Sequence, residues 1–321
     1  MSLLDVSGLH VWFEPPHAAE VHAVQGVSFT LDAGERFGLV GESGCGKTTT
    51  ILALMGLLPP NASVAGEVLL TGQNLLAGGE DSVQAYRWKD IAMVFQGAMN
   101  ALNPVKKVGW QIAEPMAYHG IAQGAAARKR AGELLEMVGI PTAAGDRYPH
   151  EFSGGMRQRA AIAMALACEP KILLADEPTT ALDVMVQAQI LELLTGLSRD
   201  LGLALVLVTH DLPVVAQVCE RAAVMYAGEI VEAGPTEALY HDPRHPYTRL
   251  LFAATPDLYG HDAVISIPGA PPRLDGEIAG CPFRPRCDVP LDRCASEHPG
   301  LRLVEVGHQA ACHRNDLVGA S

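Results

Sequence analysis

The chain has 321 residues, which is enough for two domains of about 150 residues each. Its 23 basic and 36 acidic residues give a net charge of −13. This charge excludes a protein whose main task is to coat nucleic acid, because neutralising phosphates needs a basic surface. With 49% hydrophobic and 18% charged residues, general disorder is excluded as well. The mean hydropathy of +0.16 indicates that part of the surface is buried against partners.

No segment is expected to cross a membrane. The apolar stretch 51–58 is too short for about 30 Å of hydrocarbon, and the stretch 201–209 ends in His210-Asp211. The first five residues lack the basic and apolar regions of a secretory signal. We therefore expect a cytoplasmic protein, in which seven cysteines do not form a disulfide framework.

In chain order, short apolar runs alternate with longer helical patterns over the first 235 residues or so. Strands are predicted at 27–31, 37–40, 172–175 and 204–208, and helices at 48–58, 157–167 and 188–200. Fully apolar strands are typical of a parallel sheet covered by helices on both faces. The alternation predicts an α/β fold with a mixed or parallel sheet at its core.

Two segments depart from this alternation. Residues 97–150 contain Asn103-Pro104, Glu114-Pro115 and a polar helical stretch around 125–138, but no buried-strand run, which indicates an inserted helical subdomain. After Gly234-Pro235 long apolar runs disappear, and 267–272 reads as an irregular link. We predict a cassette over 1–237, with a helical subdomain at about 97–165, and an extension over 238–321.

Residues 41–48 match the pattern G-x-x-x-x-G-K-[ST] between a predicted strand and a predicted helix. Such a loop wraps phosphates with backbone N–H groups at a helix N-terminus, whereas the alternative is a glycine-rich turn that matches by chance. Lys47 would reach the β- and γ-phosphates, and Thr48 would place its hydroxyl on Mg²⁺. The expected nucleotide-binding residues are Gly41, Glu42, Ser43, Gly44, Cys45, Gly46, Lys47, Thr48 and Thr49.

Cys45 stands inside this loop. One interpretation is a small residue tolerated in a tight turn. A thiol at a helix N-terminus can also have a lowered pKa, in which case its alkylation would block ATP binding.

The apolar strand 172–175 ends in two acids, Asp176 and Glu177. At the carboxyl edge of a parallel sheet these side chains are placed near a bound phosphate. Asp176 would hold Mg²⁺ through water, and Glu177 would polarise the attacking water. The alternative is a solvated strand end before the Pro178 turn.

Ser153-Gly154-Gly155 provides a further helix N-terminus suited to anions, with serine as its cap. The triplet follows Lys47 by 106 residues and precedes Asp176 by 23. With the P-loop and the acidic strand end, it makes the chain resemble the ATP-binding subunits of ABC transporters, whose signature is LSGGQ-like. Phe152 and Met156 are the departures from that signature.

The resemblance assigns further roles, all connected with nucleotide. Gln96 resembles the glutamine that senses Mg²⁺ or water, and Asp183 resembles the residue that communicates across a dimer. His210 resembles the histidine that contacts the γ-phosphate, so Glu177, His210 and Gln96 are the implied catalytic residues. Phe13 would stack on adenine, with Trp12 as its rival.

The resemblance also implies an assembly. Two ATP-binding subunits would sandwich two ATP molecules, each P-loop facing the partner's Ser-Gly-Gly helix. Two membrane permease subunits, a second ATP-binding subunit (expected to be a paralogue) and, indirectly, an extracytoplasmic peptide-binding protein are the implied partners, with no nucleic acid. The chain would be peripheral at the cytoplasmic face of the cell membrane.

The segment 243–251, with His245-Pro246-Tyr247-Thr248, resembles the extension of dipeptide and oligopeptide importer ATPases. It implies ATP hydrolysis that drives import of dipeptides or oligopeptides, although the same family contains nickel and glutathione importers. A soluble ABC ATPase is a further alternative, but this chain has one P-loop and no long coiled-coil insertion. A non-hydrolysing sensor is disfavoured by Glu177 and His210.

Four cysteines, Cys281, Cys287, Cys294 and Cys312, crowd the extension with five, six and seventeen residues between them. This is not the paired spacing of zinc ribbons. Four thiolates suit a [4Fe–4S] cluster, and the family extension is similar to one that carries such a cluster. Zinc is the second candidate, with His298, His308 or His313 as substitute ligands, and four unconnected thiols are the third.

Overall fold

The computed structural model describes residues 2–97, 101–254 and 267–317, in two compact units. The first unit comprises 1–32, 36–78 and 208–321, and the second comprises 33–35 and 79–207. Each unit is described by itself. In the described part of the chain, no helix combines the length and the apolar character needed to cross a membrane.

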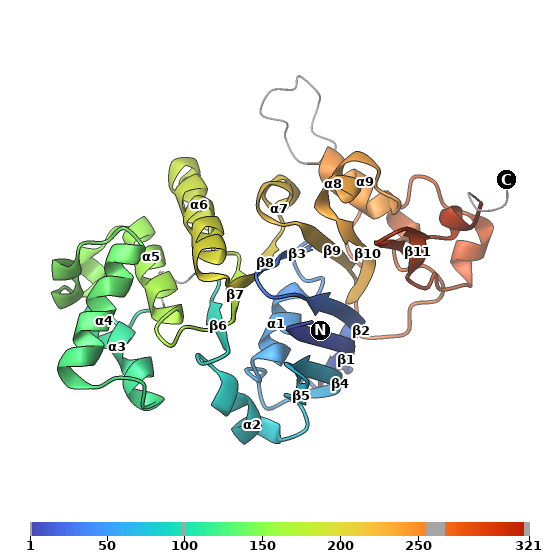
Figure 1. Ribbon diagram of the computed structural model, residues 1–321. Helices are drawn as coiled ribbons and strands as arrows, with labels where there is room; N and C mark the ends of the chain where they lie inside the picture. Colours follow the sequence, from blue (N-terminus) through green and yellow to red (C-terminus); the bar gives the residue numbers. More distant parts are fainter. Residues whose placement is uncertain (1, 98–100, 255–266, 318–321) are drawn as a thin grey trace. The chain divides into compact units, whose positions relative to one another are not determined.

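The first unit contains an antiparallel sheet and most of a mixed sheet (Figure 1). The antiparallel sheet has the order β2-β1-β4-β5, and in the mixed sheet the order is β11-β12-β10-β9-β3. β3 runs parallel to β9, whereas β10 is antiparallel to β9. The elements are β1 (Leu4–Phe13), β2 (Val21–Leu31), β3 (Arg36–Val40), α1 (Lys47–Leu54), β4 (Ala62–Leu70), β5 (Gln73–Asn74), α7 (Leu212–Val218), β9 (Arg221–Tyr226), β10 (Glu229–Pro235), α8 (Thr236–His241), α9 (Pro246–Ala253), β11 (Arg302–Glu305) and β12 (His308–Ala310).

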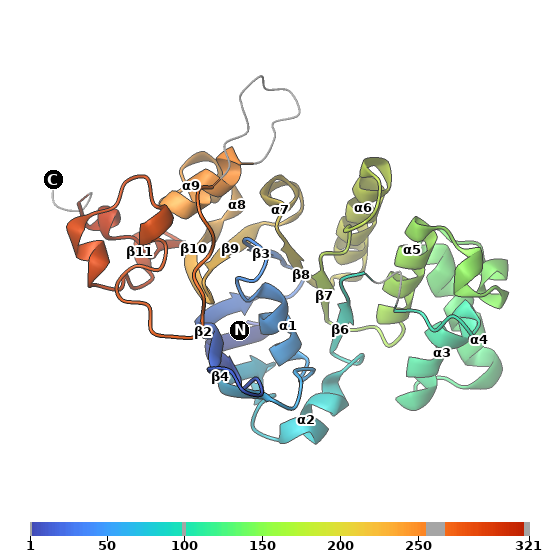
Figure 2. The same cartoon turned by 180° about the vertical axis from the view of Figure 1, so that it is seen from behind.

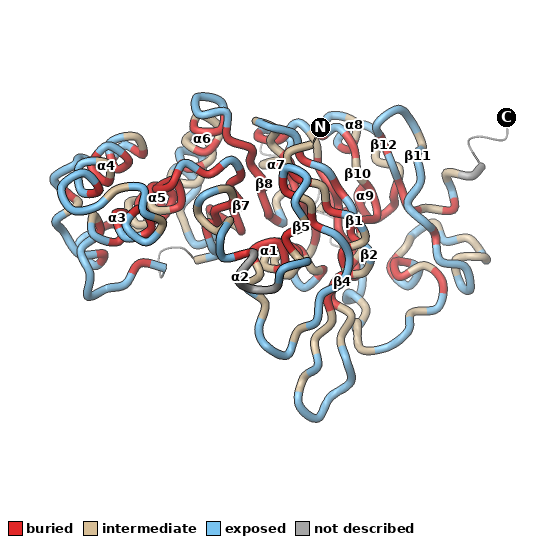
Figure 3. The backbone as a smooth tube through the Cα atoms, turned by 60° about the horizontal axis from the view of Figure 1, so that its bottom comes forward, coloured by how far each residue is buried: buried red, intermediate tan, exposed pale blue. Residues whose placement is uncertain are grey.

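The second unit combines buried strands with the helical subdomain. β8, β7 and β6 are neighbours in that order, and β6 is parallel to β7. Figure 3 shows β7 buried along its length, as the apolar run that precedes its last residue, Asp176, dictates. The elements are α2 (Gly79–Tyr86), β6 (Ile91–Val94), α3 (Val108–Tyr118), α4 (Gly124–Met137), α5 (Gly154–Ala165), β7 (Ile172–Asp176), α6 (Val184–Leu201) and β8 (Ala204–Thr209).

The α/β cassette with a mixed sheet and a helical subdomain is as predicted, but several element boundaries differ. Helix α1 ends at Leu54 rather than at residue 58, because Gly56 adopts a φ of +58° and the Leu57 N–H donates to the Leu52 carbonyl. These two features form a Schellman motif, which closes the helix. α5 and α6 begin three and four residues earlier than expected, where Ser153 and Asp183 cap them.

The predicted helix around 125–138 is confirmed as α4, and the described residues from 101 to 150 contain no strand. Residues 98–100 of the expected subdomain lie outside the described residues. α3 was not predicted, because Pro115 lies inside it. The helix continues past Pro115, although this residue lacks the N–H that would bond to the preceding turn.

The extension after α9 crosses the edge of the antiparallel sheet. The segment 267–272 is irregular, as expected. Figure 2 shows the extension passing beside the edge strand β2. There the Leu274 carbonyl, two residues after the irregular segment, accepts a hydrogen bond from the N–H of His22. The extension therefore belongs to the first unit and lies against its antiparallel sheet.

Candidate nucleotide site

The predicted P-loop connects β3 to α1 in the first unit, and two of its glycines are required by space as well as by conformation. Gly41 and Gly46 have φ values of +153° and +106°. A Cβ atom on Gly41 would lie 2.3 Å from the Met225 carbonyl oxygen, and one on Gly46 would lie 2.7 Å from the Ala23 carbonyl oxygen. Only glycine allows the loop to approach these two strands so closely.

Lys47 begins α1 and is buried, with a residue exposure of 5%. Its Nζ donates hydrogen bonds to the carbonyl oxygens of Gly41 at 2.7 Å and Glu42 at 2.9 Å. The ammonium group is thus held across the mouth of its own loop, where a phosphate would meet it. Thr48 and Thr49 follow half-buried on the first turn, while Ser43 and Gly44 are exposed.

Of the two interpretations of Cys45, the lowered pKa of its thiol is wrong. Cys45 is 4% exposed, and burial raises the pKa of its thiol above the usual value. The Lys47 ammonium, 3.7 Å from the sulfur, opposes this effect but does not overcome it. Loss of hydration of the thiolate therefore outweighs the favourable charge and helix N-terminus.

Two residues anchor the loop through contacts that the sequence did not predict. The Arg286 guanidinium donates to both carboxylate oxygens of Glu42, at 2.6 and 2.9 Å. The Tyr247 hydroxyl accepts a hydrogen bond of 2.8 Å from the Glu42 N–H. Tyr247 lies in the His-Pro-Tyr-Thr segment that the sequence singled out, whereas no sequence signal marks Arg286.

In the second unit, Glu177 follows β7 in a strained conformation. Its φ of +42° lies in the left-handed region, which is unusual for a residue other than glycine. Its Oε2 accepts hydrogen bonds from Gln96 Nε2 at 2.8 Å and from Thr180 Oγ1 at 2.9 Å. Two predicted catalytic residues, 81 positions apart, are therefore in direct contact. Asp176, 1% exposed, ends β7 immediately before Glu177.

The signature triplet forms the N-terminus of α5. The Ser153 hydroxyl accepts the N–H of Met156, and Gly154 and Gly155 open the helix. A Cβ atom on Gly155 would lie 2.7 Å from Val186 Cγ1, so the helix requires a very small residue here.

Asp183 caps α6 in the same way, by accepting the N–H of Val186. Because Val186 also contacts the position of Gly155, the triplet and the Asp183 cap are packed together.

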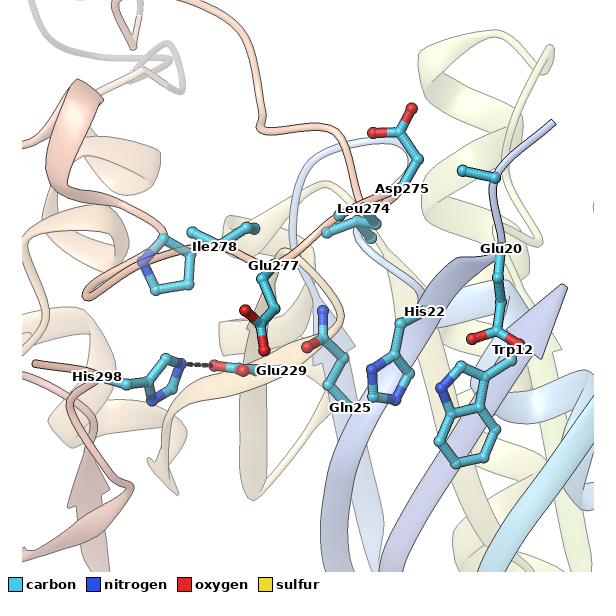
Figure 4. A pocket seen from close by; sticks show the side chains of 13 residues that line it. Trp12, Glu20, His22, Gln25, Glu229, Leu274, Asp275, Glu277, Ile278 and His298 are labelled. Atoms are coloured by element: carbon cyan, nitrogen blue, oxygen red, sulfur yellow. Dashed lines mark ion pairs between the residues drawn. The ribbon is translucent and has the colours of Figure 1, made fainter. Parts of the chain in front are cut away.

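The rival aromatic residues at the end of β1 have different surroundings. Trp12 stacks on His10 and His22, with ring centroids 5.3 and 4.6 Å apart. The stack borders a cavity of about 480 Å³ with Glu20, Gln25 and Glu229 nearby (Figure 4). The further lining residues are Ala19, Leu274, Asp275, Gly276, Glu277, Ile278, Pro282 and His298. Phe13 alternates with Trp12 along the strand and takes no part in this stack.

His210 is exposed after β8, and the next residue, Asp211, caps α7 by accepting the N–H of Val214. The first unit therefore holds the P-loop, Phe13 and His210, and the second holds Gln96, Glu177, Asp176, the signature and Asp183.

The four clustered cysteines surround one small cavity in the first unit, of about 20 Å³, with His313 beside them. All four are free thiols. His313 is 4% exposed, and its Nδ1 has no hydrogen-bond partner in the structure. His298 and His308, by contrast, are paired with Glu229 and Glu232. Among the described residues, no three His, Cys, Asp or Glu side chains are arranged to hold a metal ion.

Comparisons with known proteins agree with this geometry. The family described as ABC transporter matches residues 24–180, and the oligopeptide/dipeptide transporter C-terminal region matches 231–294. The dipeptide transport ATP-binding protein DppD of Bacillus subtilis is 46% identical over 98% of this chain and 95% of its own length. The chain belongs to the ATP-binding proteins of dipeptide and oligopeptide ABC transporters.

A further relative matches this chain over a similar share of both sequences. The oligopeptide transport ATP-binding protein OppD of Salmonella typhimurium is 44% identical over 97% of this chain and 93% of its own length. Among solved structures, a dimeric ATP-binding cassette bound to ADP and phosphate superposes with a TM-score of 0.65 and 30% identity. That likeness covers 73% of this chain and 98% of the other. The predicted family, its ATPase class and its role as the ATP-binding subunit of a peptide ABC transporter are confirmed.

Proposed function

We propose that this chain binds ATP with Mg²⁺ at residues 41–49 and hydrolyses it to power the import of dipeptides or oligopeptides. The observation that supports the proposal most strongly is the hydrogen bond of 2.8 Å from Gln96 to Glu177. The backbone of Glu177 is strained. Strain of this kind persists where a surrounding network holds it, and it is concentrated at active sites. Glu177 is thus held in one orientation by Gln96 and Thr180.

In the proposed reaction, Glu177 accepts a proton from the attacking water, and His210 contacts the γ-phosphate. Lys47 exchanges its carbonyl partners for phosphate oxygens, and Phe13 stacks on adenine. Thr48 and Gln96 are the proposed Mg²⁺ ligands, with Asp176 acting through water. The bound Mg²⁺ supplies charge neutralisation on the phosphates. With its amide nitrogen on Glu177, Gln96 has its oxygen left as the hard ligand that Mg²⁺ prefers.

The proposed assembly has two permease subunits and a second, paralogous ATP-binding subunit. Ser153, Gly154, Gly155 and Asp183 of each ATP-binding subunit would contact the nucleotide held by the other. Support comes from the dimeric cassette among the structural neighbours. The helical subdomain also exposes large apolar side chains, namely Val105, Trp110, Tyr118 and Ile121, which suit docking against membrane subunits at the cytoplasmic face.

The test is to co-purify the chain with its permease and partner ATPase and to measure ATP hydrolysis with candidate cargoes. We expect stimulation by dipeptides or oligopeptides presented by the extracytoplasmic binding protein. Stimulation by nickel or glutathione alone would instead assign the chain to those importers. An ATPase that is fully active without membrane subunits would favour a soluble ABC ATPase.

We further propose that Cys281, Cys287, Cys294 and Cys312 hold a [4Fe–4S] cluster. Support comes from the chemistry of the donors, since four free thiols line one cavity, whereas the described side chains as they stand are not arranged to hold a metal ion. Such a cluster would crosslink the part of the extension after α9, whose described residues form two short strands and short 3₁₀ turns. Anaerobic purification should give a brown protein with stoichiometric iron, whereas a colourless protein with one zinc per chain would overturn the proposal.

We keep 1–237 as the proposed ATP-binding cassette and 238–321 as its family-specific extension. The match of separate family descriptions to 24–180 and 231–294 supports this functional division.

A further inference from the structure

The extension reaches the P-loop through a buried ion pair. Arg286 lies in the short 3₁₀ turn η4 (Arg284–Arg286), and its side chain is only 3% exposed. Its guanidinium binds Glu42 with two parallel hydrogen bonds and donates a third to the Pro268 carbonyl. A bidentate pair of this kind fixes the orientation of both side chains, because a planar guanidinium matches a carboxylate in one geometry.

An aromatic cluster stabilises this turn. The Phe283 ring, which precedes η4, lies 5.2 Å from Tyr226 and 5.4 Å from Tyr247, and all three rings are at most 1% exposed. Tyr226 belongs to β9, next to the P-loop strand β3. The turn that carries Arg286 therefore cannot shift without disturbing a packed core.

Glu42 is held at three of its groups. Its carboxylate accepts from Arg286, its N–H donates to Tyr247, and its carbonyl accepts from Lys47 Nζ. Two of these three partners belong to the extension, at sequence separations of 244 and 205 residues. The third is the lysine that must leave this carbonyl when phosphate arrives.

We propose that Arg286 and Tyr247 are positioning residues that hold the P-loop open for ATP by clamping Glu42. The clamp rests on the proposed nucleotide site at residues 41–49. It keeps the loop shape fixed while Lys47 changes partners, so that no binding energy is spent on ordering the loop. Preorganisation of this kind raises affinity for ATP and leaves the chemical step at Glu177 unchanged.

The test is to compare ATP hydrolysis by the assembled transporter carrying Arg286→Gln, Arg286→Lys, Tyr247→Phe or Glu42→Gln. We expect the KM for ATP to rise about tenfold for Arg286→Gln and for Glu42→Gln, and kcat at saturating ATP to stay close to wild type for Arg286→Gln. Arg286→Lys keeps the charge but loses the planar pair of donors, so its KM should lie between those of wild type and Arg286→Gln. Tyr247→Phe should raise KM by a smaller factor.

Arg284→Gln is the matched control, since Arg284 is exposed in the same turn, and it should leave KM unchanged. A purely structural role would lower kcat through loss of folded complex while KM stays constant, and this result would overturn the clamp. If Arg286→Gln does not fold, a wild-type KM in Arg286→Lys overturns it equally.

Lys47→Ala distinguishes a failure of the clamp from a failure of the proposed nucleotide site. If Lys47→Ala abolishes ATP binding while Arg286→Gln behaves like Arg284→Gln, the clamp alone is wrong. If Lys47→Ala still binds ATP normally, the proposed nucleotide site is wrong as well.

Discussion

The P-loop and the signature triplet both lie at a helix N-terminus, but different structural features shape them. The P-loop is shaped by distant neighbours, since Glu42 is bonded to Tyr247 and Arg286 over 205 and 244 residues of sequence. The helix that Ser153 caps is instead begun by a bond to Met156, three residues away. A helix N-terminus can be prepared for an anion locally, whereas a loop that must avoid two strands depends on the tertiary structure around it.

The largest effect is expected when a new side-chain atom clashes with the backbone that surrounds the P-loop. In Gly41→Ala the new Cβ would meet the Met225 carbonyl oxygen at 2.3 Å, and backbone cannot move aside as a side chain can. We expect ATP affinity to fall at least about tenfold, measured with a fluorescent nucleotide.

Gly44→Ala is the matched substitution, because a Cβ there meets nothing within 4 Å although its φ is +81°. It should cost only the strain of the left-handed conformation, about 1–2 kcal/mol of stability. Equal losses of affinity in the two variants would contradict the view that distant neighbours shape this loop.

An intermediate effect is expected at the signature, where one neighbour accounts for the constraint. Gly155→Ala would place a Cβ 2.7 Å from Val186 Cγ1 and should lower the free energy of unfolding by about 1–3 kcal/mol. Adding Val186→Ala should restore most of that loss, as measured by denaturant unfolding. If the double variant is no more stable than Gly155→Ala, the contact is not a local pair.

The smallest effect concerns the reactivity of Cys45. Because burial raises the pKa of its thiol, little thiolate is present at neutral pH and the thiolate nucleophile is scarce. Iodoacetamide at pH 7.5 should label Cys45 much more slowly in the native protein than in urea, and raising the pH to 9 should increase the native rate. Rapid native labelling at neutral pH, read by peptide mass spectrometry, would contradict the burial of this thiol.

The difference between locally shaped and distantly shaped sites explains which features the sequence could predict. The P-loop, the acidic end of β7 and the capped helix at Ser153 are consecutive residues whose pattern reflects local geometry. The buried strands were recognisable because burial on both faces requires unbroken apolar runs. The roles expected of Gln96 and Glu177 came from the family resemblance, and the contact between the two residues was not predicted.

The features that the sequence did not predict depend on tertiary structure. Nothing near Arg286 distinguishes it from Arg284, yet one is buried on Glu42 and the other is exposed. The alternative of a lowered pKa for the Cys45 thiol is wrong because the thiol is buried, which the local sequence does not show. The continuation of α3 through Pro115 is likewise a tertiary override of a local signal.

The central claim, that the chain hydrolyses ATP through Glu177, is tested most directly by Glu177→Gln in the assembled transporter. The variant keeps the size of the side chain and an acceptor for Gln96, but it cannot take a proton from water. We predict that kcat for ATP hydrolysis falls at least about a hundredfold while ATP still binds. Hydrolysis close to the wild-type rate would contradict the assignment of Glu177 and, with it, the proposed mechanism.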